Sequence, residues 1–111
     1  MSTGTAAEQI NAARAMVTMA LAFSHFPAPE LRLDRLPQTR DGSEYVWGVS
    51  VSLHDSLSHF EQWREALGLD PADVEAHLKG STHWLNILGT WGGIRVRLTG
   101  FFTFHDPAPA R

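Results

Sequence analysis

The sequence predicts an α+β fold in which one four-stranded antiparallel sheet is covered on one face by helices. Three observations predict it: a strictly alternating hairpin near the C-terminus, a second alternating segment in the middle of the chain, and an amphipathic helical segment before each of them. The predicted order is therefore helix, strand, strand, helix, strand, strand. A circularly permuted ferredoxin-like fold would have this order, although the two halves share no sequence identity that would indicate a repeat.

The last hairpin, residues 83–104, can be assigned residue by residue around a turn at Gly92-Gly93. Two consecutive glycines favour a two-residue turn, because its central residues need a positive φ. Apolar and polar residues alternate from Ile94 to Thr99, which is typical of a strand with one buried face. The predicted pairs on the covered face are Trp91–Ile94, Gly89–Val96, Ile87–Leu98 and Leu85–Gly100; those on the other face are Thr90–Arg95, Leu88–Arg97, Asn86–Thr99 and Trp84–Phe101.

A helix is predicted from about Ala6 to Ser24, because Thr5 and Glu8 form a capping box and Pro27 and Pro29 end the helical pattern. One face of this helix carries Ile10, Ala13, Val17, Leu21 and Ser24, and it is widened by Met16, Met19, Ala20 and Phe23. A broad apolar stripe most often packs into a core, so we expect this face to cover the sheet.

The middle of the chain is predicted to form two strands. Leu31 to Leu36 is a short strand, and residues 37–43 are a polar loop with a turn at Asp41-Gly42. A clear strand follows over Glu44 to Leu53, and we expect Leu33 and Val46 to face each other across this hairpin. One face of the second strand carries Tyr45, Trp47, Val49, Val51 and Leu53, and the other carries Gly48, Ser50, Ser52 and His54.

A second helix is predicted to begin after a cap at Asp55 or Ser56 and to run to about Leu67, with Gly68 at its end. Asp70-Pro71 then favours the start of a short helical segment, Pro71 to Leu78. The sequence leaves open whether residues 71–78 form a strand instead.

The chain of 111 residues is long enough for a single domain with its own core, with frayed ends at about 1–4 and 106–111. Its 43% hydrophobic and 19% charged residues are typical of a globular protein. A formal net charge of −3 gives no overall attraction to nucleic acid or to anionic lipid.

The absence of cysteine from the sequence excludes disulfides, thiolate catalysis and thiolate zinc sites. The N-terminal residues do not show the pattern of a secretory signal. The longest apolar stretch, Ala15–Phe23, has about half the length of a membrane-spanning helix. We therefore expect a cytoplasmic protein that does not cross a membrane.

Three segments carry a resemblance that covers most of the chain from about Leu21 to Phe102: Phe26-Pro-Ala-Pro-Glu-Leu, Phe60-Glu-Gln-Trp-Arg-Glu-Ala-Leu-Gly and Gly89-Thr-Trp-Gly-Gly-Ile-Arg-Val. They resemble small uncharacterised proteins that are common in actinobacteria and in their phages and integrated elements. The resemblance implies an actinobacterial origin, a cytoplasmic location and a mobile-element context. It implies no activity, and hence no catalytic residue.

No pattern in the sequence indicates catalysis, a metal site or a cofactor. The run His54-Asp55-Ser56 contains the residue types of a catalytic triad, but triad members come from separate elements, and Asp55 and Ser56 suit helix caps better. The histidines do not follow metal-ligand spacing, although the sequence leaves open whether some converge in space: His25, His54, His59, His77, His83 and His105.

The candidate functional site is the second face of the last hairpin. If helices cover the first face, the second exposes aromatic, apolar and arginine side chains together: Trp84, Leu88, Arg95, Arg97, Thr99 and Phe101. A patch of this composition favours a non-enzymatic binding protein that associates with itself or with a protein partner. The alternatives are a nucleic-acid platform, which the acidic net charge disfavours, and a patch covered by the C-terminal tail or by Pro27–Arg40.

Overall fold

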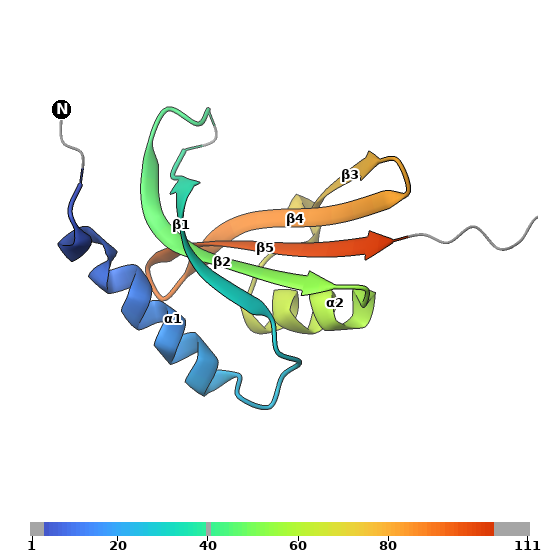
Figure 1. Ribbon diagram of the computed structural model, residues 1–111, viewed down its shortest axis with the longest axis horizontal. Coiled ribbons are helices and arrows are strands. Elements are labelled where there is room, and N and C mark those ends of the chain that lie inside the picture. The colour runs from blue at the N-terminus through green and yellow to red at the C-terminus, as the bar shows by residue number, and fades with distance from the viewer. Residues whose placement is uncertain (1–3, 40, 104–111) are drawn as a thin grey trace, which may run out of the picture.

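Two α-helices and a five-stranded mixed sheet make up the part of the chain that the computed structural model describes, residues 4–39 and 41–103 (Figure 1). The elements are the 3-10 turn η1 (Ala6–Gln9), α1 (Ile10–Ala22), β1 (Glu30–Pro37), β2 (Tyr45–His54), α2 (Leu57–Ala66), the 3-10 turn η2 (Pro71–Asp73), β3 (Glu75–Lys79), β4 (Thr82–Trp91) and β5 (Ile94–Thr103). The predicted α+β class is confirmed. The predicted frayed ends, apart from Gly4, lie outside the described residues.

The sheet has the strand order β1-β2-β5-β4-β3. Three neighbouring pairs are antiparallel, but the central pair, β2 with β5, is parallel. The prediction of four antiparallel strands was therefore wrong in strand number and in one orientation. The reason is that α2 crosses beneath the sheet after β2, so the later strands return as a unit whose last member lies alongside β2.

The additional strand is β3, where the sequence favoured a helical segment over residues 71–78. Only Pro71–Asp73 is helical, as one 3-10 turn, and Asp70 caps it by accepting a hydrogen bond from the N–H of Ala72. Beyond it, Glu75–Lys79 pairs with β4 through a two-residue turn at Gly80-Ser81. Tertiary pairing thus overrides a weak local helix signal.

The register of the β4–β5 hairpin is confirmed at every predicted pair, from Trp91–Ile94 to Trp84–Phe101. Gly92 and Gly93 both have a positive φ, at 58° and 81°, as a two-residue turn of this type requires. The register predicted for the first hairpin was wrong. Leu33 lies opposite Val49 and not opposite Val46, because Pro37 still pairs with Tyr45 and the connecting loop is therefore centred later in the chain than the predicted pairing requires.

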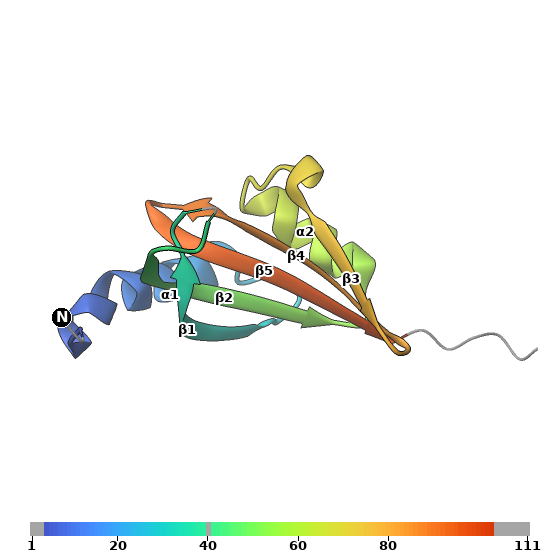
Figure 2. The same cartoon turned by 90° about the horizontal axis from the view of Figure 1, so that it is seen from above.

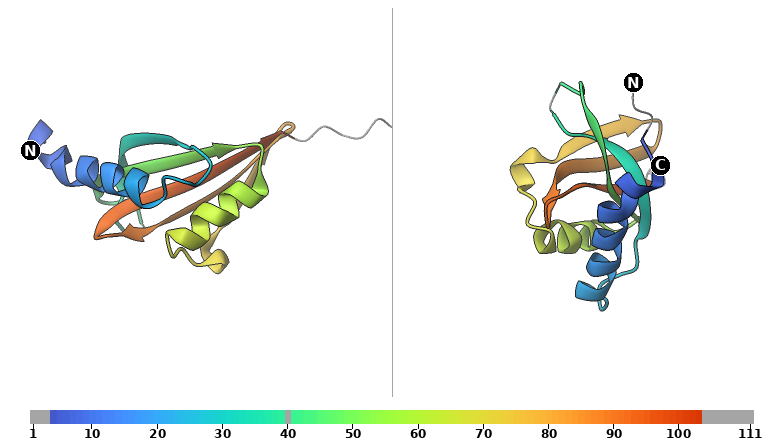
Figure 3. Two further views of the ribbon diagram at one scale, coloured as in Figure 1. Left: turned by 90° about the horizontal axis from the view of Figure 1, so that it is seen from below. Right: turned by 90° about the vertical axis from the view of Figure 1, so that its left-hand side faces the viewer.

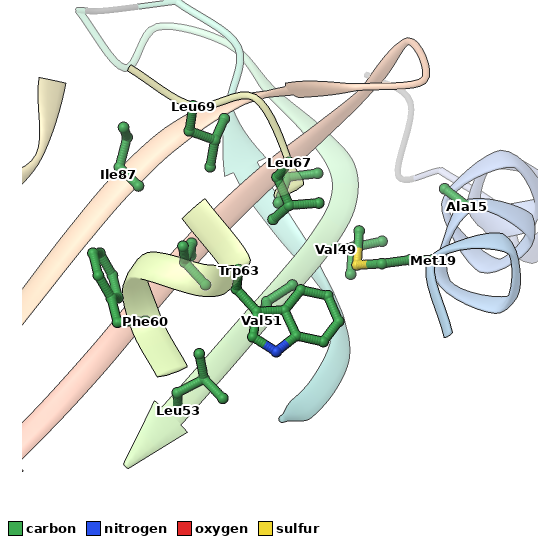
Figure 4. Close-up of a cluster of buried hydrophobic side chains, with 12 residues drawn as sticks. Ala15, Met19, Val49, Val51, Leu53, Phe60, Trp63, Leu67, Leu69 and Ile87 are labelled. Carbon is green, nitrogen blue, oxygen red and sulfur yellow. The ribbon is translucent and has the colours of Figure 1, made fainter. Parts of the chain in front are cut away.

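Both helices pack on the same face of the sheet and lie one after the other along it (Figures 2 and 3). The core is formed between them and the sheet, with the cluster Ala15, Met19, Val49, Val51, Leu53, Phe60, Trp63, Leu67, Leu69, Ile87, Val96 and Leu98 (Figure 4). Valine and leucine from alternate positions of β2 and β5 point into it, as the period of two predicts. The helices therefore leave the opposite face of the sheet uncovered.

Helix α1 buries only part of the face predicted for it. Met19 is buried, and Met16 and Phe23 pack against the core, as expected. The other buried residues are Ala12 and Ala15, whereas Val17 and Leu21 are 59% and 73% exposed. Apolar residues occur around most of this helix, so periodicity does not select one side. The alanine side allows the helix to approach the sheet more closely, and this packing decides which face is buried.

Helix α2 begins at the cap that the sequence predicted. The Ser56 hydroxyl accepts a hydrogen bond from the N–H of His59 at 3.2 Å, which is the interaction expected of an N-cap residue. Thr5 makes no such side-chain bond at the start of η1, so the predicted capping box does not form.

Replacing Ser56 by alanine is expected to lower the free energy of unfolding by about 1 kcal/mol, because the N–H of His59 loses its acceptor. Urea denaturation measures this change. Ser56→Asp supplies another acceptor and is expected to retain most of the stability. An equal loss in both variants would show that capping is not the cause.

Candidate docking face

The six residues singled out from the sequence all lie on the uncovered side of the sheet. We call this side the open face, and the strand register determines which residues belong to it. The edge strand β1 and its neighbour β2 contribute Glu30, Arg32, Asp34 and Leu36, and Val46, Gly48, Ser50, Ser52 and His54. The strands β5, β4 and β3 contribute Arg95, Arg97, Thr99, Phe101 and Thr103, then Thr82, Trp84, Asn86, Leu88 and Thr90, and finally Glu75, His77 and Lys79. The structure thus brings together Trp84, Leu88, Arg95, Arg97, Thr99 and Phe101.

Exposure differs among these six residues. Thr99 is buried, whereas the aromatic, leucine and arginine side chains are half-buried. The segment expected as a cover does not lie over them, because residues 30–37 form the edge strand β1. The C-terminal tail, which is the other expected cover, lies outside the described residues.

An aromatic row, made of His54, Phe101, Trp84 and His77, crosses four strands of the open face. Phe101 lies opposite Trp84, the His54 ring stacks on Phe101, and the His77 ring stacks on Trp84. Both stacks have ring centroids 5.2 Å apart and nearly parallel planes. The row therefore offers two stacked ring pairs on neighbouring strands to a partner.

A glutamate lies beside each histidine at the ends of the aromatic row. The Nε2 atom of His54 is 3.3 Å from a carboxylate oxygen of Glu30, and that of His77 is 3.7 Å from one of Glu75. All four side chains are well exposed, so each pair contributes little to stability.

Sequence reasoning did not find the two histidines as members of the site. The alternation of β2 placed His54 on the same face as Ser50 and Ser52, which was a usable signal. However, its position beside Phe101 depends on the parallel pairing of β2 with β5. His77 was missed because its strand was expected to be helical.

The two arginines of the open face have different environments. The Nε–H of Arg95 donates a hydrogen bond to the backbone carbonyl of Pro37 at 2.8 Å, which fixes that side chain against β1. Arg97 lies between Ser50 of β2 and Leu88 of β4, and its side chain forms no hydrogen bond or ion pair with the described residues. A half-buried guanidinium of this kind favours an incoming carboxylate.

A groove of about 810 Å³ lies at one end of the open face. The β1–β2 connection contributes Thr39 and Asp41, η2 and the start of β3 contribute Asp73 and Glu75, and β4 and β5 contribute Asn86, Leu88 and Arg95. In the right-hand view of Figure 3, the β1–β2 connection and β3 both rise on the side away from the helices. The open face is therefore concave in this region, and carboxylates border it on both sides.

Asp41 is held as an anion at the border of the groove. Its Oδ1 accepts a hydrogen bond from the Thr39 hydroxyl at 2.6 Å and another from the N–H of Ser43 at 2.9 Å. These bonds lower the pKa of the Asp41 carboxyl from 3.8 to about 2, and the bond from Thr39 has the largest effect.

Because this pKa is lower in the folded chain, the stabilisation of the loop by Asp41 is complete above about pH 4 and disappears as the pH falls through about 2. An NMR titration of the Asp41 carboxyl carbon is expected to have its midpoint near pH 2. Thr39→Val removes the largest cause and is expected to move the midpoint upward. An unchanged midpoint would show that the Thr39 hydroxyl does not form this bond in solution.

The run His54-Asp55-Ser56 has three separate structural roles. His54 stacks in the aromatic row and Ser56 caps α2. Asp55 has a positive φ of 60° and joins β2 to β5, since its N–H donates to Phe101 and its carboxylate accepts from the N–H of Thr103. Among the described residues, no group of three histidine, aspartate or glutamate side chains could hold a metal ion. His105 lies outside them.

Comparisons of the chain with known protein families, with curated proteins and with solved structures found no match. Within residues 4–39 and 41–103, neither helix is long and apolar enough to cross a membrane.

Proposed function

We propose that this is a non-enzymatic binding protein that docks another protein chain on its open face. The observation that carries the proposal is the combination, on a sheet face that the helices leave uncovered, of the aromatic row with the guanidinium of Arg97, which has no polar partner among residues 4–39 and 41–103. Binding hot spots are enriched in tryptophan, tyrosine and arginine, and they lie where a partner excludes water. The centre of the open face has this composition.

The shape of the open face favours a different protein over a second copy. The groove is lined from two sides, by the β1–β2 connection and by η2 with β3. Two concave surfaces cannot interdigitate at their centres, whereas a convex edge or an extended segment can enter a groove. Shape complementarity at stable interfaces is close to that of protein interiors.

The charges indicate what the partner presents. Arg97 favours a carboxylate at the centre, and Leu88 with Trp84 favours apolar side chains beside it. The carboxylates of Asp41 and Glu75 favour basic groups toward the rim. We therefore propose a partner with a central acidic residue among apolar ones. A cytoplasmic, accessory or regulatory role in a mobile element rests on the sequence resemblance alone.

Nucleic acid is the second candidate, because aromatic rings and arginines on a sheet can stack bases and hold phosphates. Two features oppose it. The groove carries carboxylates on both sides, and the chain has a formal net charge of −3. Both repel a phosphate backbone.

The proposal is tested by capturing host proteins on immobilised wild-type protein and on variants, and then measuring the affinity of the purified partner. Arg97→Glu, and separately Trp84→Ser with Phe101→Ser, are expected to weaken binding at least about tenfold. Matched controls on the exposed side of α1, Arg14→Glu and Leu21→Ser, are expected to bind as the wild type does.

Three results would contradict the proposal. The first is a purified partner that binds the open-face variants as tightly as the wild type. The second is the absence of any partner that survives purification. The third is tight, salt-dependent binding of an oligonucleotide that Arg97→Glu abolishes, which would favour the second candidate.

A further inference from the structure

Strand β3 ends the sheet, and its outer edge has no neighbouring strand within the described part of the chain. Figure 1 shows no other described element alongside that edge. Four of its five residues are exposed, and Leu78 is 63% exposed. An edge with unpaired backbone groups and an exposed leucine is a template for a further strand.

The sequence of β3, Glu75-Ala-His-Leu-Lys79, is complementary to itself in the antiparallel direction. A two-fold axis through His77 places Glu75 of each copy opposite Lys79 of the other, on the open-face side. The same axis places Ala76 opposite Leu78, a small residue against a large one, on the helix side. The two Leu78 side chains become diagonal neighbours, within reach of each other.

The backbone groups required for this pairing already point outward. The two-residue turn at Gly80-Ser81 joins Lys79 to Thr82, and a turn of this kind places these flanking residues in a hydrogen-bonded pair. Paired positions alternate along antiparallel strands, so Lys79, His77 and Glu75 direct their N–H and C=O groups to β4. Ala76 and Leu78 therefore direct theirs to the free edge, where the proposed register joins them across the two-fold axis.

We propose that two copies of the chain associate through their β3 strands, antiparallel and centred on His77, to form one continuous sheet. The strand that binds this edge is a second copy of β3, because antiparallel pairing of β3 with itself places each glutamate opposite a lysine. Such a contact uses the same patch on both copies, so it closes as a dimer and does not continue into a fibre.

The proposed dimer does not require the proposed docking function, although Glu75 and His77 belong to both surfaces. It uses the edge of the sheet, while the groove floor at Leu88 and the guanidinium of Arg97 stay accessible on each copy. The two aromatic rows become continuous, because His77 of one copy lies opposite His77 of the other. A partner with two equivalent docking segments would then gain from binding both faces.

Charge exchange tests the proposal by sedimentation velocity over a range of protein concentrations at low salt. Wild type is expected to show a concentration-dependent dimer. Glu75→Lys alone, and Lys79→Glu alone, place like charges opposite each other twice across the axis, and are expected to raise the dissociation constant about tenfold or more. The double variant, Glu75→Lys with Lys79→Glu, reverses both charges and is expected to restore the dimer.

Mixing the two single variants gives the sharpest result. One presents only cations at these positions and the other only anions, so the mixture is expected to form a mixed dimer at concentrations at which each variant alone dimerises weakly. Leu78→Pro removes an outward N–H without removing a bond to β4, and it is also expected to give a monomer with native circular dichroism. A monomeric wild type at every concentration, or a dimer unchanged by both single exchanges, would overturn the proposal. Neither result bears on partner binding through Arg97 and Trp84.

Discussion

Replacing Trp63 by alanine is expected to lower the free energy of unfolding by about 3–5 kcal/mol, since it empties a large site in a closely packed core. The Trp63 side chain is only 1% exposed and is the largest in the core. Its indole edge meets the rings of Phe23 and Phe26, with centroids 5.4 Å away in both cases. These contacts join α2 to the segment that follows α1.

The indole N–H of Trp63 also donates a hydrogen bond to the backbone carbonyl of Pro27 at 2.9 Å. Urea denaturation of Trp63→Ala and of Trp63→Phe separates the two contributions. The phenylalanine variant keeps most of the apolar volume and loses the bond, so we expect it to cost about 1–2 kcal/mol less than alanine costs. A cost below about 1 kcal/mol for Trp63→Ala would contradict this account of the core.

The second large effect is expected at Gly48, where β2 and β5 approach each other closely. A Cβ atom at this position would overlap the backbone carbonyl oxygen of Arg95 and lie 2.9 Å from Cδ1 of Leu36. The backbone cannot move aside without separating the central parallel strands. We expect Gly48→Ala to cost about 3 kcal/mol, at the upper end of the usual range for overpacking.

Gly89→Ala is the matched control for Gly48→Ala. A Cβ atom there would overlap Cδ2 of Leu69, which is the end of a flexible side chain and can change rotamer. We expect a clearly smaller loss of stability in thermal or urea unfolding. An equal or larger loss for Gly89→Ala would show that the contact between β2 and β5 is looser than described.

The local elements follow closely from the sequence, because each depends on neighbouring residues. The turn chemistry of Gly92-Gly93 and the alternation along β5 determine the register of that hairpin, and Ser56 determines where α2 begins. The six candidate residues share one face for the same reason. A period of two fixes the face of a residue once a single pair is known.

Long-range pairings do not follow from the sequence. The parallel contact of β2 with β5 joins segments about fifty residues apart, and nothing local at Ser50 marks Arg97 as its neighbour. The helix-favouring sequence at Pro71–Asp73 also led to a helical prediction for the strand that follows it. The groove and both histidines of the aromatic row depend on these pairings. The sequence therefore predicted the hairpin residues of the candidate site but not the groove or the histidines.

Helix α1 illustrates a different limit. Alanine and larger apolar residues occur on most of its sides, and hydrophobic pattern alone favoured the side with Val17 and Leu21. The structure buries Ala12 and Ala15 instead. Small side chains allow a helix to lie close to a sheet, which brings more atoms into van der Waals contact.

The most direct test of the central claim is hydroxyl-radical footprinting of the protein, free and bound to its purified partner. The docking account predicts that oxidation of Trp84 and Phe101 becomes several-fold slower in the complex. Leu21 and Leu57, which are exposed on the helices, should react at the same rate in both states. Unchanged oxidation of Trp84 and Phe101, together with protection of Leu21, would contradict the claim and place the partner on the helical side.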